Sequence, residues 1–237
     1  MNGFLEKLEK EIAQTWKQIL DNNRLSQLVM SQQFDIRLYA LYLLETYHYT
    51  VHNSRNQALV GASLQPEADI HYLKFCFKHA YEEAGHELMA LHDLKSLGNI
   101  VLPQPLPIAM ESTQTLISFL YHISKTGNLN GRLGYSLWAE DAYTFIAPLL
   151  DVVRTLLKLK PAQMTFLVEH SNIDAEHIVQ VRKMIERVAA TKDDHDAIRS
   201  VAIRSLQLTG LVLNEVADQY QQLVLGRSTK YAFLSSL

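Results

Sequence analysis

The chain has 237 residues, of which 48% are hydrophobic and 20% are charged, and its formal net charge at pH 7 is -3. This composition is enough for one large hydrophobic core and excludes a disordered or fibrous chain. Acidic and basic residues are well mixed, so the sequence offers no basic stripe for nucleic acid and no polybasic block for an anionic membrane. We expect one domain over residues 1–237 that binds neither nucleic acid nor membrane.

The single cysteine and the first residues of the chain indicate a cellular compartment. Cys76 is the only cysteine, so no internal disulfide can form. The N-terminal stretch "MNGFLEKLEKEIAQTW" is amphipathic and lacks the apolar block of a signal peptide. No apolar run approaches the ~20 residues that a membrane span needs. These features predict a soluble, cytoplasmic protein.

The apolar residues recur mostly at intervals of three and four, and glycine and proline are few, with nine and six residues. This pattern is typical of an all-α chain. The predicted helices cover about residues 4–20, from 34 onward, 67–97, 108–125, 133–157, from 161 onward, and 194–225, with a short tail from about 226. We therefore expect a single bundle of seven or so helices.

The stretch "HSNIDAEH" places His170, Asp174 and His177 at positions i, i+4 and i+7. On a helix, seven steps return to within roughly 20° of the start, so the three side chains would leave from one face. Alternatively, Ser171 and Asn172 break the helix, and the three side chains converge from two helices. Either arrangement could hold a metal ion.

Two other stretches supply further ligands. In "HAYEEAGHELM", Glu83 is three residues and Glu82 four residues before His86, so at least one glutamate shares a helix face with this imidazole. Glu140 lies in "SLWAEDAY", inside an otherwise apolar helix. A carboxylate buried there needs a partner, because an unpaired charge in a low-dielectric core costs several kcal/mol. A cation would be such a partner.

The predicted metal site combines three imidazoles and three carboxylates from Glu83, His86, Glu140, His170, Asp174 and His177. Such mixed nitrogen and oxygen ligation suits Fe(II), Mn(II) or a pair of these ions and argues against structural zinc. The carboxylates could bridge two metals about 3.5 to 4 Å apart. Among these metals we expect iron.

A competing assembly uses nearly the same residues. Glu45, then Glu83 with His86, Glu140, and Asp174 with His177 follow the order of ligands in ferritin-like di-metal bundles. In that scheme Glu45 is a ligand and His170 is not, whereas the first scheme requires His170 and leaves Glu45 out. A third interpretation is ordinary, since a lone histidine on a helix is more often a surface or hydrogen-bonded core residue than a ligand.

The order of "YLLETYHYTVH", "EEAGHELMALHDLKSLG", "WAED" and "HSNIDAEH" resembles the haem-oxygenase-like di-metal oxidase group, including the CADD-like proteins and their neighbours in the TenA and pyrroloquinoline-quinone synthase superfamily. The resemblance covers roughly residues 30–190. It implies a seven-helix haem-oxygenase-like bundle, commonly a homodimer, in which two irons activate O2 to oxidise a small organic substrate.

Two relatives fit less well. Haem oxygenases use a proximal histidine near the start of the chain, but the first histidine here is His48, so no haem is expected. TenA-type thiaminases have their nucleophilic cysteine on a later helix than Cys76, which is better explained as a small buried apolar residue. A metal-free TenA-like hydrolase or small-molecule-binding bundle remains the alternative.

Further residues are candidates for a pocket around the metal site. Tyr47 and His48 could line it from the second helix, although aromatic residues at such spacing are more often core. His79 shares a helix face with His86 and is a candidate pocket or supporting residue. The choice between Glu82 and Glu83 as ligand stays open. Because ligation needs deprotonated histidines, metal affinity is expected to fall as the pH drops toward and below ~6.

Overall fold

A computed structural model describes residues 2–237, except for the side chains of Asn2 and of residues 169–175. Across these residues the chain forms eleven α-helices and three short 3-10 helices and no β-strand. The prediction of an all-α bundle is therefore confirmed. The helix count exceeds seven because three predicted helices are interrupted and residues 24–30 form a further helix outside the predicted ranges.

The α-helices are α1 (Asn2–Asn22), α2 (Arg24–Met30), α3 (Ile36–Thr50), α4 (Asn53–Ser63), α5 (Ile70–Glu82), α6 (Glu87–Ser96), α7 (Glu111–Ile123), α8 (Arg132–Ala139), α9 (Ala142–Leu157), α10 (Thr165–Val188) and α11 (Lys192–Val224). The 3-10 helices are η1 (Leu129–Gly131), η2 (Pro161–Gln163) and η3 (Ala232–Ser236).

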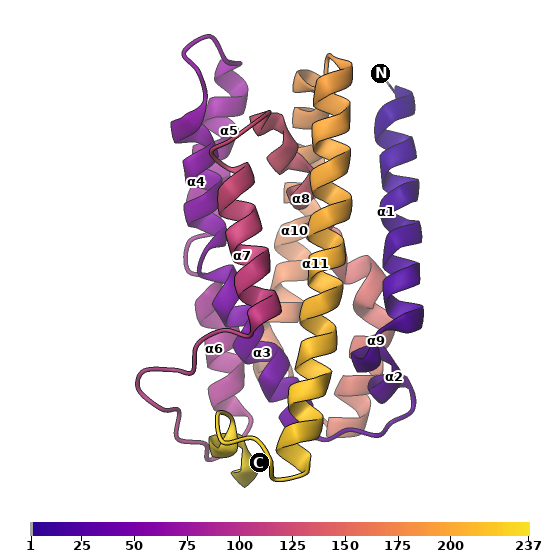
Figure 1. Cartoon of the computed structure of the whole chain (residues 1–237), viewed down its shortest axis with the longest axis vertical. Helices are drawn as coiled ribbons and strands as arrows, with labels where there is room; N and C mark the ends of the chain where they lie inside the picture. Colours follow the sequence, from indigo (N-terminus) through magenta and orange to yellow (C-terminus); the bar gives the residue numbers. More distant parts are fainter. Residues whose placement is uncertain (1) are drawn as a thin grey trace.

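The longest helix, α11, organises the bundle. It runs along the long axis of the molecule and packs against α1, α3, α7 and α8 (Figure 1). Its buried positions follow the three-to-four-residue spacing of an amphipathic helix, as in Ile198, Val201, Ala202 and Ser205. One continuous core of buried side chains extends from these positions to the other helices.

Besides the helix predicted from residue 34 onward, which forms α3 and α4, two predicted helices are each divided in the structure. Residues 67–97 form α5 and α6, separated by a turn that contains Gly85 with a φ of +101°. Only glycine adopts such an angle without strain, so the glycine at position 85 favours a turn at this place. Residues 133–157 form α8 and α9, separated at Glu140 and Asp141. Both interruptions fall at carboxylates of the predicted metal site.

The helix α10, in contrast, is continuous. Its backbone is helical from Thr165 to Val188, so the possible break at Ser171 and Asn172 does not occur. The backbone stays helical through these polar residues. Tertiary packing of α10 against α6 and α8 stabilises the continuous helix. The backbone positions of His170, Asp174 and His177 therefore share one helix face.

A close approach between α8 and α11 fixes the position of Glu140. A Cβ added to Gly134 would lie 2.1 Å from the backbone oxygen of Ile198 and 2.8 Å from the backbone nitrogen of Ala202. Any side chain at position 134 would therefore push the helices apart. The glycine lets α8 cross α11 backbone to backbone and brings the end of α8 to the centre of the bundle.

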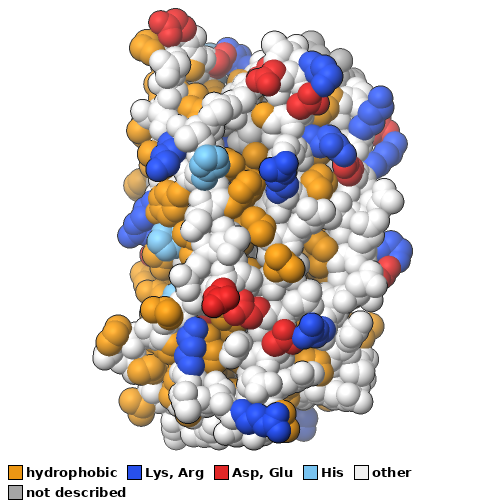
Figure 2. Space-filling view, viewed as in Figure 1, with side chains coloured by type: hydrophobic (Ala, Val, Ile, Leu, Met, Phe, Trp, Pro, Cys, Tyr) orange, Lys and Arg blue, Asp and Glu red, His pale blue; other side chains and the backbone are white. Residues whose placement is uncertain are grey.

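The surface carries mixed charges. Acidic and basic side chains are interspersed on the face shown in Figure 2. No helix in the described part of the chain combines the length and apolarity needed to cross a membrane. After Gly226 the chain turns back onto the bundle, where the side chains of Tyr231 and Leu234 are completely buried.

Asp194 joins the start of α11 to the segment that leads into α8. Its carboxylate accepts hydrogen bonds from the backbone nitrogen and hydroxyl of Thr191 at 2.9 and 2.7 Å, and from the amides of Asn128 and Asn130 at 2.9 and 2.8 Å. Burial raises the pKa of Asp194, but these hydrogen bonds outweigh it and hold the pKa well below its ordinary value.

We predict that Asp194→Ala lowers the free energy of unfolding by about 2 kcal/mol at pH 7, because several hydrogen bonds to one charged group are lost. A depressed pKa stabilises the fold above the ordinary carboxyl pKa of about 4, and the effect disappears as the pH falls through the folded-state value. The difference between mutant and wild type in urea unfolding should therefore shrink below pH 4. The exposed Asp196→Ala serves as control and should change stability by only a few tenths of a kcal/mol.

Candidate metal centre

The first part of the centre is built by the end of α5. Glu83 caps the C-terminus of this helix, and its side chain is 6% exposed. His79 lies one turn earlier and is equally buried. Beyond the turn at Gly85, Nδ1 of His86 lies 3.3 Å from Oε1 of Glu83. Glu83 and His86 are therefore close although they belong to different helices.

The second part comes from α8 and α10. Glu140 caps the C-terminus of α8, and its Oε1 shares a 3.0 Å hydrogen bond with Nε2 of His79. His177 enters from α10, with Nδ1 3.3 Å from Oε2 of Glu140 and 3.7 Å from Oε1 of Glu83. The rings of His79 and His177 meet edge to face, with centroids 4.9 Å apart. Three segments far apart in the sequence thus converge.

Four residues each offer one ligand atom within 4.8 Å of all the others: His79, Glu83, Glu140 and His177. Three of them, Glu83, Glu140 and His177, belong to the predicted ligand set. The fourth predicted ligand, His86, lies beside this group through its contact with Glu83. The side chains of His170 and Asp174 lie outside the described residues, so their predicted role as ligands stays a prediction.

The electrostatics of the centre are unusual, because both carboxylates lie at helix C-termini. The backbone carbonyls there already carry partial negative charge, and a carboxylate at this end of a helix is unfavourable. Burial raises the pKa of Glu140, yet contacts with His177 and His79 outweigh it and hold the pKa well below its usual range. For Glu83, burial also raises the pKa, but the contact with His86 helps to lower it overall. Both groups are therefore anions that need cationic neighbours.

The histidine from α10 responds to these anions. Burial lowers the pKa of His177, but the contact with Glu140 and the charges of Glu83 and Glu82 outweigh it, and the pKa is raised overall. In the metal-free protein a proton on His177 therefore supplies part of the positive charge that the two carboxylates require.

Hydrogen bonds do not satisfy all polar atoms of the centre. Oε1 of Glu83, Nδ1 of His79 and Nδ1 of His177 are buried without a hydrogen-bond partner among the described residues. Leaving such atoms unpaired in a protein interior is costly. A metal cation would take up the free lone pairs, and a set of imidazoles and carboxylates without thiolate fits iron or manganese. The residues present are thus suited to a non-haem metal.

Burial and contacts favour one side of two choices that the sequence analysis leaves open. Glu83 is buried in the group, whereas Glu82 is 31% exposed, pairs with Lys78 at 3.1 Å and lies 3.5 Å from Nε2 of His177. Glu45, which the ferritin-like scheme requires, is not a member of the group and accepts a hydrogen bond from the backbone nitrogen of Met110 at 3.0 Å. The arrangement therefore favours the scheme without Glu45.

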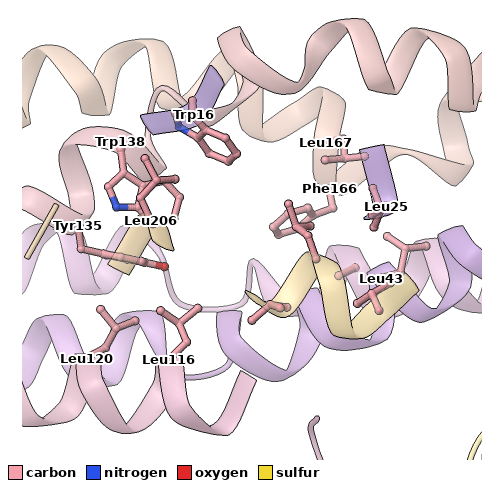
Figure 3. Close-up of a cluster of buried hydrophobic side chains, with 14 of the residues drawn as sticks. Trp16, Leu25, Leu43, Leu116, Leu120, Tyr135, Trp138, Phe166, Leu167 and Leu206 are labelled. Carbon is pink, nitrogen blue, oxygen red and sulfur yellow. The ribbon is translucent and has the colours of Figure 1, made fainter. Parts of the chain in front are cut away.

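A cavity of about 180 Å³ reaches the centre, with Glu83 and Glu140 in its wall. Most of the wall is apolar, and Figure 3 shows Trp16, Tyr135 and Trp138 on one side of this region and Leu25, Phe166 and Leu167 on the other. The expectation that Tyr47 and His48 line this cavity is wrong. They line a separate hollow beside Gln104 and Pro105, because the face of α3 that meets the cavity carries Tyr42 and Tyr49.

The chain is thus an all-α bundle with a buried group of histidine and glutamate side chains that could hold a metal ion beside an apolar cavity. The comparison with protein families makes this more specific. The model of a family described as iron-containing redox enzymes matches residues 40–210. The chain therefore belongs to this family. No curated protein sequence matches the chain.

Solved structures support the fold. A domain of unknown function with a haem-oxygenase-like fold from Shewanella denitrificans OS217 is 42% identical, with a TM-score of 0.90 over 95% of this chain and 97% of that one. TenA homologues from Pyrococcus horikoshii OT3 and Pyrococcus furiosus are each 18% identical, with TM-scores of 0.70 and 0.69. The matches cover 91% and 90% of this chain and 98% and 99% of theirs. The two TenA homologues show similarity of fold alone. The predicted haem-oxygenase-like fold is confirmed.

The sequence analysis did not place His79 in the centre itself. It was a candidate for the surroundings of the site because it shares a face with His86, but in the structure it contacts Glu140 directly. The signal that could have placed it is its spacing of four residues before Glu83, which puts both side chains on one face of α5.

We predict that Gly85→Ala destabilises the protein by about 1–2 kcal/mol, because an alanine at this positive φ is strained even though its Cβ would meet no atom within 4 Å. Urea unfolding measures the loss. Gly3→Ala is the matched control, since Gly3 also has open space but lies in helix α1 without a positive φ, where alanine is neutral or stabilising. Equal effects of the two substitutions would contradict the role of the turn.

Proposed function

We propose that the protein is a non-haem iron oxidase or oxygenase that uses O2 to oxidise a small, amphipathic organic molecule. The proposed ligands of two irons, or of iron and manganese, are Glu83, His86, Glu140, His170, Asp174 and His177. The observation that carries the proposal is the group of buried, incompletely satisfied carboxylates and imidazoles, whose two carboxylates lie in the wall of an apolar cavity. Membership of the iron-containing redox enzyme family supports it.

The residues of the chain have distinct tasks in this proposal. Glu83 and Glu140 offset the charge of the metal, and neutral imidazoles donate lone pairs to it. His79 holds the carboxylate of Glu140 through its hydrogen bond and so fixes the direction of one ligand. The aromatic wall of the cavity excludes water and orients an apolar substrate. Iron bound here would supply the redox chemistry that activates O2.

The alternative of a metal-free TenA-like hydrolase has less support. Its chemistry would need an accessible nucleophile, and the only cysteine of the chain, Cys76, is 0% exposed. Burial raises the pKa of the Cys76 thiol to about 12, so almost no thiolate is present at neutral pH. Cys76 is also absent from the wall of the main cavity.

We predict that the protein loaded anaerobically with Fe(II) retains about two irons per chain by elemental analysis. Glu140→Gln and His177→Ala should each reduce this to well under one iron, because each removes a central ligand. Stoichiometry near zero in the folded wild type would refute the iron centre. Loss of loading in Glu45→Gln, with retention in His170→Ala, would instead support the ferritin-like scheme.

Metal affinity and metal-free stability should depend on pH in opposite directions. The raised pKa of His177 means that its proton competes with metal even above pH 6.5. Below that pKa, the apparent affinity for Fe(II) measured anaerobically by calorimetry should fall about tenfold per pH unit for one displaced proton. In the metal-free protein the same raised pKa stabilises the fold at low pH, and the contribution is lost as the pH rises through the folded-state value. An affinity that does not change between pH 6 and 8 would exclude His177 as a ligand.

The resemblance to the di-metal oxidase group also leads us to propose a homodimer. Sedimentation analysis of the purified protein tests this proposal independently of metal loading. A monomer at micromolar concentration would contradict it.

A further inference from the structure

One wall of the cavity differs from the others. The helix α3 presents six polar or phenolic side chains to the cavity: Tyr39, Tyr42, Glu45, Thr46, Tyr49 and Thr50. Their spacing follows a single helix face, which covers about 16 Å along the helix axis. The facing walls are mainly aliphatic and aromatic, as in Leu116, Trp138 and Phe166. An apolar cavity with one polar wall is suited to a ligand that has a polar group of its own.

Glu45 is the charged group in this wall. The residue is 1% exposed, and its Oε2 accepts the hydrogen bond from the backbone nitrogen of Met110. Its Oε1 is buried and has no hydrogen-bond partner among the described residues. Burial raises the pKa of Glu45, although the nearby Thr113 and Met110 oppose the shift. Such a free carboxylate oxygen is costly unless a ligand satisfies it.

A purely structural role accounts for the hydrogen bond of Oε2 of Glu45 but not for Oε1. Oε2 stabilises the N-terminus of α7, but this terminus already has a second carboxylate, Glu215 on α11. Glu215 accepts hydrogen bonds from the backbone nitrogens of Glu111 and Ser112 at 3.3 and 2.8 Å. Glu215 is absent from the cavity wall, whereas Glu45 belongs to it. Oε1 has the hydroxyl of Thr113 nearby but forms no hydrogen bond to the described residues.

We propose that Glu45 binds a hydrogen-bond donor of the substrate, an ammonium or hydroxyl group, while another part of the same molecule approaches the metal centre. The substrate class is thus an apolar molecule with a donor group away from its reacting end. This proposal rests on the proposed function, because it takes the cavity as the substrate site. Glu45 would then be a specificity-determining residue and not a metal ligand.

Two further observations support a ligand group at this wall. Oγ1 of Thr50 is also buried without a hydrogen-bond partner among the described residues, and it lies about one and a half turns along α3 from Glu45. A hydroxyl group can both donate and accept, so it can bind either kind of polar group. A carboxylate end of a ligand, in contrast, would be repelled by Glu45 and attracted by a metal ion at Glu83 and Glu140.

The chain contains a suitable reporter. Its two tryptophans, Trp16 and Trp138, both line the cavity, so intrinsic tryptophan fluorescence responds to a ligand there. We would titrate the metal-free protein with hexylamine, hexanol and hexanoate, which share an apolar chain and differ in the polar end. Wild type should bind hexylamine about tenfold or more tightly than hexanoate, because a charge-assisted hydrogen bond replaces repulsion.

Two matched variants separate ligand binding by Glu45 from its stabilisation of the N-terminus of α7. Glu45→Gln keeps an oxygen for the backbone nitrogen of Met110 but removes the charge, so the preference for hexylamine should fall to within about threefold of hexanoate. Glu215→Gln weakens the same helix terminus from outside the cavity and should keep the full preference. Equal affinities of wild type for the three ligands, or equal loss of preference in both variants, would overturn the proposal. The first of these results does not depend on the stability of any variant, since the wild-type comparison needs no substitution.

Failure of this inference can be distinguished from failure of the proposed function. The ligand titration uses metal-free protein, whereas the iron centre is tested by elemental analysis. Iron loading without a preference for hexylamine would refute the role of Glu45 and leave the iron centre intact. A preference that is abolished by Glu45→Gln in a protein that binds no iron would support Glu45 and refute the oxidase.

Discussion

The structure depends on the compensation of negative charge at two buried helix ends. Glu83 and Glu140 cap the C-termini of α5 and α8, where the backbone is itself partially negative. Neither carboxylate could stay ionised at such a place without positive neighbours, since the interior screens charge poorly. In the metal-free protein His177 gives part of this compensation, and the contact with His79 also lowers the pKa of Glu140. A metal ion would give it more fully, and this demand is the physical reason for expecting one.

The architecture of the bundle follows from placing these two ends together. The turn at Gly85 and the interruption after α8 each place a buried carboxylate at the end of a helix. There the side chain is not restricted to the directions that a position inside a helix allows. The contact of Gly134 with α11 brings the end of α8 inward. Continuity of α10 then holds His177 against both carboxylates. Local helix energy is lost at the interruptions, and the packing of the long helices around them offsets it.

The cavity beside the charged centre is mainly apolar. Its apolar walls keep water from the centre and so preserve the strength of every charge interaction there. The cavity has polar groups in two different walls. Glu45 lies in the wall formed by α3, and Glu83 and Glu140 of the metal centre lie in another. A molecule bound between them would be oriented end to end, which is the arrangement that positions one reacting atom at a metal.

The sequence by itself determined the all-α class, the residue types of the centre and three members of the buried group, Glu83, Glu140 and His177. Helical periodicity and the cost of an unpaired buried carboxylate were sufficient for this, because both are local properties of the chain. Only the tertiary structure decided where the helices are interrupted, that His79 contacts Glu140, and that α3 turns Tyr42 and Glu45 toward the cavity and Tyr47 away from it. These facts depend on the rotation of each helix about its axis, and that rotation is set by packing against distant segments such as α11.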